Sequence, residues 1–391
     1  MDRCFYPHSF EAIERAEEAK NDKQRRPSSA IRRRYRRPAC DEQPAFIKSM
    51  AKLDQNSINV TTAYFCYEKF LKEDVQMRFD WSQVPFSCTA KGGRLPKERI
   101  HRKTIQIENM IELCIVFLNH LTKITGLGKV RVVEFCAGSG FVLLPLAAKF
   151  PDVQFVLLDW KEPSVQIGRE RIREASLNNV DIFVGDVRSY NEGFHLGIAL
   201  HACGFASDLC LQSCISSGAA FVCAPCCIGK ILLFRHEGLS LAFKTSMNKE
   251  DFKHLVKAGD FGHSIEEVLS HGDEVCSSRR KAKSYVEEDR RLFALENKYN
   301  SYITTMFPKG STPKDDIIVG WPNYHYVFHH DRCIDIDTKE NDDDFKNTQR
   351  EKCSGLRDDN CKNNWFGNFD EEVFRKHTPV ARRVSRSSTQ Q

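Results

Sequence analysis

The stretch that decides the fold is Val132-Val133-Glu134-Phe135-Cys136-Ala137-Gly138-Ser139-Gly140. Its first half is a short apolar run of the kind found in buried strands, and its second half carries two glycines. Glycine adopts positive φ readily and lets the backbone approach a ligand closely. The pattern therefore predicts a strand, a tight turn and the start of a helix, whose first N–H groups point at whatever is bound there.

The turn departs from the dinucleotide-binding pattern Gly-x-Gly-x-x-Gly, because the residue three after Gly140 is Leu143. The missing glycine would allow close helix–strand packing around a pyrophosphate. Its absence, with the acid Glu134 before the turn, favours a ligand without phosphate. S-adenosylmethionine is such a ligand. We expect Glu134 to act near its ammonium end and Cys136, Gly138 and Gly140 to bind its amino-acid tail.

Further apolar runs rich in Val, Ile and Phe follow, and amphipathic stretches separate most of them. The predicted strands are 130–135, 154–158, 181–184, 196–200, 219–223, 300–306 and 316–320. Strand–helix alternation of this length predicts a parallel sheet with both faces covered. With the last two strands as a hairpin, the fold class is α/β, a doubly wound, Rossmann-like sheet of seven strands of the class I methyltransferase type.

Acidic residues follow the second and third predicted strands. Asp159 ends the second strand, where a carboxylate can accept both ribose hydroxyls, a role that NAD-binding folds share. Asp186 ends the third, where a side chain commonly meets the adenine amine. Each acid alone is as compatible with a cap or a turn. Three acids in register on successive strands, at the edge where open sheets bind ligands, predict an adenosylmethionine site.

The fourth and fifth strands end in sulfur-rich segments. The fourth runs into His201-Ala202-Cys203-Gly204, with Asp208 shortly after, and the fifth runs into Pro225-Cys226-Cys227. Because neighbouring strands end at the same edge, we expect His201, Cys203, Cys226 and Cys227 to converge.

Four interpretations of this cluster stay open. In the simplest, the cysteines fill a tight crevice and His201 packs on the cofactor. His201 or Asp208 could instead act as acid–base or positioning groups. One His and three Cys also make a tetrahedral zinc set, but the usual paired short spacings are absent, so no metal ligand is predicted. Finally, Cys226 could be a thiolate nucleophile.

The segments around these residues resemble the methyltransferase-like domain of the glutathione S-transferase C-terminal domain-containing proteins, within the class I methyltransferase superfamily. The resemblance rests on 199–204 with Asp208, on 225–227, on a lead-in helix and on a closing hairpin. The lead-in residues are Leu95-Pro96, Arg99, Arg102-Lys103, Gln106 and Asn109, and the hairpin carries Arg279-Arg280, Ser311-Thr312-Pro313-Lys314 and Ile318-Val319-Gly320.

This resemblance implies S-adenosylmethionine-dependent methyl transfer by a domain over residues 92–322. RNA-modifying relatives of the family make RNA the expected substrate. Ser207 stands where the family usually has Thr. Residues 1–90 show no glutathione-transferase-like helices, so glutathione conjugation is not expected. At the reacting centre we expect His201, Asp208 and Cys226.

Charge and composition frame this expectation. The 391 residues carry a net charge of +5, and 41% are apolar, which supports a buried core and excludes a wholly disordered chain. Residues 1–90 read as polar and largely irregular, with a basic run over 23–37 that is either a solvated arm or a tether for nucleic acid. Residues 329–391 read as a disordered tail. A second group of basic residues is Arg279, Arg280, Lys281 and Lys283.

The sixteen cysteines are expected to be reduced thiols, because the first residues lack an apolar secretory core. No apolar run reaches the length of a membrane span. We therefore expect a protein of the cytoplasm or the nucleus, without membrane contact. The alternatives to an RNA methyltransferase are a non-catalytic scaffold with the same fold and a methyltransferase that acts on proteins.

Overall fold

A computed structural model describes residues 43–58, 64–65, 79–125, 128–260, 273–308, 312 and 314–323. The basic run 23–37 and the tail 329–391 lie outside these residues. No helix in the described ranges is long and apolar enough to cross a bilayer.

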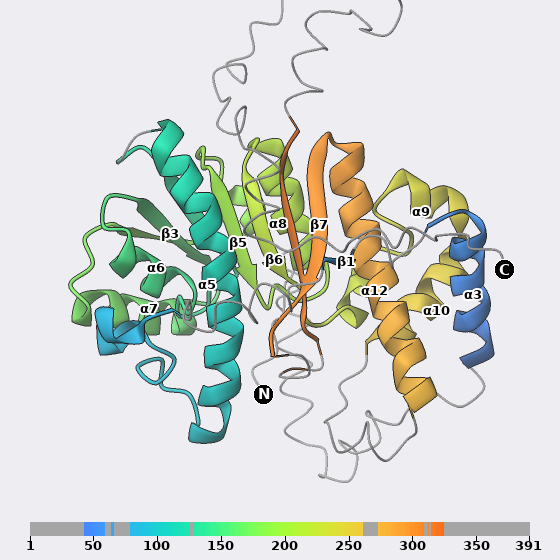
Figure 1. The fold of residues 1–391 in the computed structure, drawn as a ribbon, viewed down its shortest axis with the longest axis horizontal. Helices are drawn as coiled ribbons and strands as arrows, with labels where there is room; N and C mark the ends of the chain where they lie inside the picture. The colour runs from blue at the N-terminus through green and yellow to red at the C-terminus, as the bar shows by residue number, and fades with distance from the viewer. Residues whose placement is uncertain are drawn as a thin grey trace, which may run out of the picture.

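The centre of the molecule is one mixed sheet, ordered β1-β7-β8-β6-β5-β2-β3-β4 (Figure 1). Its strands are β1 (Tyr64–Phe65), β2 (Arg131–Phe135), β3 (Gln154–Asp159), β4 (Val180–Val184), β5 (Leu196–Leu200), β6 (Ala220–Ala224), β7 (Tyr299–Thr305) and β8 (Asp316–Pro322). Strands β2 to β6 pair in parallel, whereas β8 is antiparallel to both β6 and β7. All seven predicted strands and the terminal hairpin are confirmed. The two-residue β1, parallel to β7, was not predicted.

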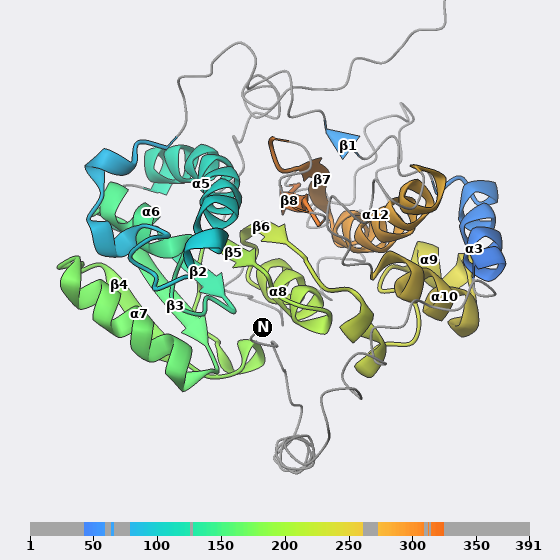
Figure 2. The same ribbon diagram turned by 90° about the horizontal axis from the view of Figure 1, so that it is seen from below.

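Helices cover both faces of this sheet, as the strand–helix alternation predicts. The helices are α3 (Gln43–Gln55), α5 (Lys97–Thr125), α6 (Leu143–Lys149), α7 (Glu162–Glu174), α8 (Phe205–Ser216), α9 (Leu241–Ser246), α10 (Lys249–Gly259) and α12 (Asp273–Glu296), with the short 3-10 turns η3 (Trp81–Gln83), η4 (Phe86–Cys88), η5 (Val187–Ser189) and η6 (Gly229–Leu233). Figure 2 shows α5 and α6 on the side of the sheet opposite to α8.

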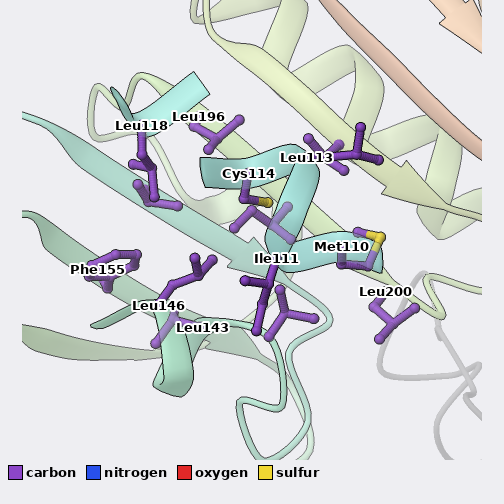
Figure 3. Close-up of a cluster of buried hydrophobic side chains, with 14 of the residues drawn as sticks. Met110, Ile111, Leu113, Cys114, Leu118, Leu143, Leu146, Phe155, Leu196 and Leu200 are labelled. Atoms are coloured by element: carbon purple, nitrogen blue, oxygen red, sulfur yellow. The ribbon is translucent and has the colours of Figure 1, made fainter. Parts of the chain in front are cut away.

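The main core lies between α5, α6 and the sheet (Figure 3). Apolar residues of α5 recur three or four apart, at Ile107, Met110, Ile111, Cys114 and Leu118, and all are fully buried. This spacing places them on one face of the helix, where they pack on alternate residues of the strands. The first turns of α5 project beyond this contact, toward the carboxyl ends of the strands.

A separate helical layer extends the fold beyond β7, where α3, α9, α10 and α12 lie together (Figures 1 and 2). Phe46, Met50 and Leu53 of α3 are buried in this cluster. Their spacing of four and three residues gives α3 an apolar face, which burial against α10 and α12 stabilises. Within 1–90, which the sequence indicated to be largely irregular, this helix is therefore an addition to the core that the sequence analysis did not predict.

A buried ion network joins α8, α12 and the segments around them. It comprises Asp208, Arg235, Lys283, Glu287, Asp289, Arg290 and Asp316, each at most 8% exposed. Arg290 donates to Asp208 Oδ1 at 2.7 Å, to Glu287 Oε2 at 2.7 Å and to the carbonyl of Gly204 at 2.9 Å. Arg235 donates to the other oxygen of Asp208 and to Asp289.

This network corrects the predicted role of Asp208. Both carboxylate oxygens of Asp208 accept from buried arginines, so Asp208 holds α8 to α12 and is not an acid–base group at a reacting centre. The basic residues Arg280, Lys281 and Lys283 of α12 are each paired with acidic residues. Lys283 is buried against Glu287 and Asp316, Arg280 pairs with Asp315, and Lys281 pairs with Asp54.

Candidate functional site

The turn after β2 has the backbone geometry that the glycines predicted. Cys136, Gly138 and Gly140 have φ of 53°, 59° and 74°. A Cβ on Gly140 would lie 2.9 Å from Leu157 Cδ1, so this glycine is required for packing. A Cβ on Gly138 would meet nothing within 4 Å, so space remains above the backbone at this position. The two glycines therefore serve different purposes, and Gly138 is the one that leaves room for a ligand.

Asp159 connects the end of β3 to this turn. Its Oδ2 accepts from the N–H of Gly138 at 2.8 Å and its Oδ1 accepts from the N–H of Lys161 at 2.8 Å. The residue is 6% exposed. Each carboxylate oxygen has two lone pairs, so Asp159 can still accept one further hydrogen bond on each oxygen. A fixed carboxylate beside an open glycine turn fits the predicted ribose and amino-acid ends of S-adenosylmethionine.

Asp186 follows β4 as the cap of the short η5 turn. Its Oδ1 accepts from the backbone N–H of Arg188, and its two oxygens accept from the guanidinium of Arg188 at 2.8 and 2.9 Å. Its position next to Asp159 in the sheet agrees with the strand-end pattern, since Gly185 N–H donates to Asp159 O. Contact of Asp186 with adenine stays a prediction, and it would require the carboxylate to share its lone pairs with Arg188.

Glu134 is the second-last residue of β2, just before the turn, and it lies on the face covered by α5 and α6. Its Oε2 accepts from the N–H of Leu143 at 2.9 Å, so it caps the start of α6. Only 2% of the residue is exposed. Burial raises the pKa of Glu134 to about 7, although the Leu143 N–H favours the charged form. Its proposed contact with the ammonium end of the cofactor stays a prediction, because the contact that the structure gives it is this cap.

This burial predicts a pH dependence of stability. Since the pKa of Glu134 is higher in the folded chain than the ordinary 4.5, the folded state binds more protons between pH 4.5 and 7. The free energy of unfolding therefore falls as the pH rises through this window. Between pH 5.5 and 8 we expect the free energy of unfolding of the wild-type chain to fall by roughly 2 kcal/mol more than that of Glu134→Gln, because the variant has no carboxyl group at this position. Urea denaturation at both pH values measures the difference, and parallel changes in the two proteins would contradict it.

His201 follows β5 in a left-handed conformation, with φ of 70°. Non-glycine residues in this region are strained, and such strain collects at functional sites. His201 Nε2 lies 2.9 Å from Gln106 Oε1. Burial, with the positive charge of Lys103, lowers the pKa of His201 well below 6.5, so the imidazole is neutral. An amide oxygen can only accept, so Nε2 carries the proton and Nδ1 is the basic nitrogen.

The predicted convergence is confirmed for Cys203, Cys226 and Cys227, and His201 lines the same cavity as Cys226. Leu200 pairs with Ala224, so the two segments leave the sheet side by side. Cys203 Sγ lies 3.0 Å from Cys226 Sγ, which lies 3.6 Å from Cys227 Sγ. Hydrogen bonds from Cys203 and Cys226, with the charges of Lys314 and Lys230, lower the pKa of Cys227, so the cluster stabilises a thiolate.

A cavity of about 310 Å³ opens beside this cluster, at the carboxyl ends of the strands. Its lining residues are Leu95, Arg99, Arg102, Lys103, Gln106, Phe141, His201, Cys226, Thr312 and Lys314. Four of these ten residues are cationic and none is acidic. We call this feature the cationic cavity. Through Phe141 it reaches the glycine turn, and through His201 and Cys226 it reaches the ends of β5 and β6.

The charges of the cationic cavity come mainly from the first turns of α5. Among the described residues, neither Arg99 nor Arg102 forms an ion pair, and both are exposed. Lys103 lies 5.0 Å from the centre of the Phe141 ring. These residues belong to the lead-in helix of the family resemblance, and no role for them followed from the sequence. Their spacing of three and four residues ahead of the apolar face of α5 is the signal that could have placed them together.

Arg171 is a second residue that the sequence analysis missed. It is buried on α7 and donates to the carbonyls of Ser87, Ser139 and Thr89 at 2.7, 2.7 and 3.1 Å. Its guanidinium also stacks 4.7 Å from the centre of the Phe141 ring. Arg171 therefore fixes the glycine turn and the segment before α5 in one position. A basic residue within an amphipathic helix carries no sequence signal for this role.

Two further cavities lie away from these residues. One of about 500 Å³ lies at the opposite edge of the sheet, lined in part by Asp152, Gln154 and Asn179. The other, of about 120 Å³, lies between α5 and Phe307. Parallel sheets bind ligands at the carboxyl ends of their strands, so the cationic cavity is the better candidate for a reacting centre.

Comparison with known protein families points to the same part of the chain, the residues at the carboxyl ends of the strands. Residues 102–232 match the family model described as a methyltransferase domain. They run from the cationic turns of α5 through Gly138, Asp159 and His201 to η6. Residues 102–232 form a methyltransferase-like domain. The predicted resemblance is confirmed, and the domain supports S-adenosylmethionine as the cofactor.

Several similar proteins are named glutathione S-transferase C-terminal domain-containing protein. The chain is 32% identical over 247 residues to the glutathione S-transferase C-terminal domain-containing protein homolog of Drosophila melanogaster, covering 63% of this chain and 40% of the relative. It is 31% identical to the Xenopus laevis protein of that name, covering 62% and 38%. The chain thus spans about two fifths of the length of these relatives. One similar solved structure is the O-methyltransferase TomG from Streptomyces achromogenes in complex with SAM, with 13% identity, a TM-score of 0.34 and coverage of 65% and 95%.

Proposed function

We propose that this chain is an S-adenosylmethionine-dependent methyltransferase that acts on RNA. The observation that carries the proposal is the cationic cavity, which adjoins the glycine turn of the methyltransferase domain. A cofactor held at the turn and a polyanion held in the cavity would meet at His201 and Cys226.

The cofactor would be held by residues from two neighbouring strand ends. S-adenosylmethionine supplies an activated methyl group when bound. Gly138 offers open backbone for its amino-acid end, and Asp159 offers a fixed carboxylate for its ribose hydroxyls. The buried position of Asp159 strengthens such hydrogen bonds, because water competes for them less.

The substrate class follows from the charge of the cavity. Arg99, Arg102, Lys103 and Lys314 supply four positive charges and no lining residue opposes them. Phosphates of an RNA backbone are the natural counter-charge, and arginine binds phosphate with two parallel hydrogen bonds. Lys314 also pairs with Asp260, so α5 supplies most of the attraction.

His201 is the residue in this cavity best suited to handle a proton. It is neutral, and Gln106 fixes its Nε2 so that Nδ1 is left as the basic nitrogen. A neutral imidazole beside the acceptor atom can remove the proton that methylation of a hydroxyl or amine releases. Cys226 would shape the same wall.

Transfer of labelled methyl from S-adenosylmethionine to total RNA and to total protein tests the proposal. We expect label in RNA, and reversal of charge in Arg99→Glu/Arg102→Glu should lower the transfer at least about 10-fold by losing phosphate contacts. The wild-type rate should also fall steeply with salt. Binding of S-adenosylmethionine should not change in this variant, since neither arginine lies at the glycine turn.

A matched control reverses two exposed lysines at the opposite edge of the sheet. Lys129→Glu/Lys149→Glu changes the net charge by the same amount but leaves the cationic cavity intact. Equal losses in the two variants would mean that only net charge matters. Label in protein alone would contradict the choice of RNA, and label in neither pool would contradict catalysis.

A further inference from the structure

The three cysteines at the ends of β5 and β6 form a compact sulfur cluster. The Sγ atoms of Cys203, Cys226 and Cys227 all lie within 4.8 Å of one another. Two of the separations are 3.0 and 3.6 Å, and all three residues are free thiols. In a tetrahedral site with Zn–S bonds of about 2.3 Å, the sulfurs are about 3.8 Å apart. The two separations thus lie within about 0.8 Å of the spacing that a zinc ion requires.

We propose that Cys203, Cys226 and Cys227 bind one zinc ion through three thiolates. Thiolate is the ligand that zinc prefers, and three protein ligands leave one tetrahedral position for water or a substrate atom. Cys226 lines the cationic cavity, so this fourth position adjoins the substrate side of the domain. The site is distinct from the cofactor site at Gly138 and Asp159. It does not depend on RNA being the substrate.

The backbone holds the cluster in place without a metal. The N–H of His201 donates to the carbonyl of Ala224 at 3.2 Å, which ties the two sulfur-bearing segments at their bases. Gly204 has φ of 64°, and a Cβ there would lie 2.6 Å from Lys230 Cβ, so the chain after Cys203 lies against the chain after Cys227. Arg290 also holds the Gly204 carbonyl from the buried ion network. A site fixed in this way loses little conformational entropy when it binds an ion.

The surroundings also balance the charge. Three thiolates and Zn²⁺ carry one net negative charge. Lys230 and Lys314 supply positive charge close to Cys227. His201 is not part of the close set of ligand atoms, and its Nε2 already bonds to Gln106, so we do not assign it as a ligand.

The test is the zinc content of the full chain, purified under reducing conditions and measured by mass spectrometry of the metal. We expect one zinc per chain, and substitution of cobalt should give thiolate-to-cobalt charge-transfer absorption. Cys226→Ser and Cys203→Ser should each weaken zinc binding, measured by competition with a chromophoric chelator, by more than about 100-fold. Cys214→Ala, a buried cysteine of α8 outside the cluster, should keep one zinc.

Circular dichroism shows whether each variant is folded, and Cys227→His provides a second check because it replaces one ligand by another. That variant should retain zinc with lower affinity. The proposal is overturned if the wild-type chain holds no zinc, or if Cys226→Ser binds zinc as tightly as the control. A Cys203–Cys226 disulfide in anaerobically purified protein would likewise overturn it. None of these readouts uses methyl transfer, so failure of the proposed function leaves this test intact.

Discussion

Arg290→Met is expected to cost about 3–5 kcal/mol of stability, a large part of the total free energy of unfolding of an ordinary domain. Arg290 is fully buried and donates to Asp208, Glu287 and the carbonyl of Gly204. Methionine fills similar space but donates nothing, so two carboxylates would lose a buried counter-charge. Removing one partner of a buried ion group is costly even where the complete group contributes little net stability. Urea denaturation followed by circular dichroism gives the change.

The control for this prediction is an exposed ion pair. Lys253→Met removes a cation 3.0 Å from Glu250, where the two side chains are 44% and 67% exposed. Surface pairs contribute at most about 1 kcal/mol, so this variant should unfold close to wild type. If Arg290→Met does not fold at all, Arg290→Lys keeps the charge and should give a measurable intermediate loss. Stabilities of Arg290→Met and Lys253→Met that agree within error would show that the network does not hold the fold.

Asp159→Asn should weaken the binding of S-adenosylmethionine by at least about 100-fold, because hydrogen bonds to a charged acceptor contribute roughly 1.5–3 kcal/mol each. The variant loses the charge that the ribose hydroxyls would face. It also presents an NH₂ group to Gly138 or Lys161, whose N–H groups both donate to the carboxylate. The glycine turn would then lose its anchor as well. Calorimetric titration with S-adenosylmethionine measures the affinity directly.

Asp152→Asn is the matched control, since it makes the same chemical change at the opposite edge of the sheet. It should bind the cofactor like wild type. Unfolding curves of both variants separate a local effect at the turn from a general loss of structure. Binding by Asp159→Asn within threefold of the control would remove Asp159 from the cofactor site.

The sheet could be predicted because its signals are local. Apolar runs such as 154–158 and 196–200 are short and separated by amphipathic stretches, which is sufficient to place parallel strands and helices. The glycine turn could be predicted as well, because the turn requires positive φ at Gly138 and Gly140, which glycine adopts readily. The convergence of Cys203 and Cys226 followed from topology alone, because adjacent parallel strands end at one edge.

The roles of charged residues could not be predicted in the same way. In the sequence, Asp208 looks like a reactive acid and Lys283 looks like a surface base, yet both are buried in the ion network. Their partners lie up to 82 residues away in sequence, as for Asp208 and Arg290. Such pairings depend on the packing of α8 against α12, which no periodicity encodes. For the same reason Arg171 and the cationic turns of α5 gained a role only in three dimensions.

The build of α5 has a consequence for how the cavity recognises its ligand. Arg99, Arg102 and Lys103 belong to the same 29-residue helix whose later turns are locked into the main core. Along such a helix, positions 99 and 103 are separated by a rise of about 6 Å that no loop movement can alter. The helix therefore fixes the spacing of the backbone positions that carry these charges. A ligand must match this spacing. Discrimination between ligands would therefore change through substitutions on the first two turns of α5 rather than through remodelling of a flexible lid.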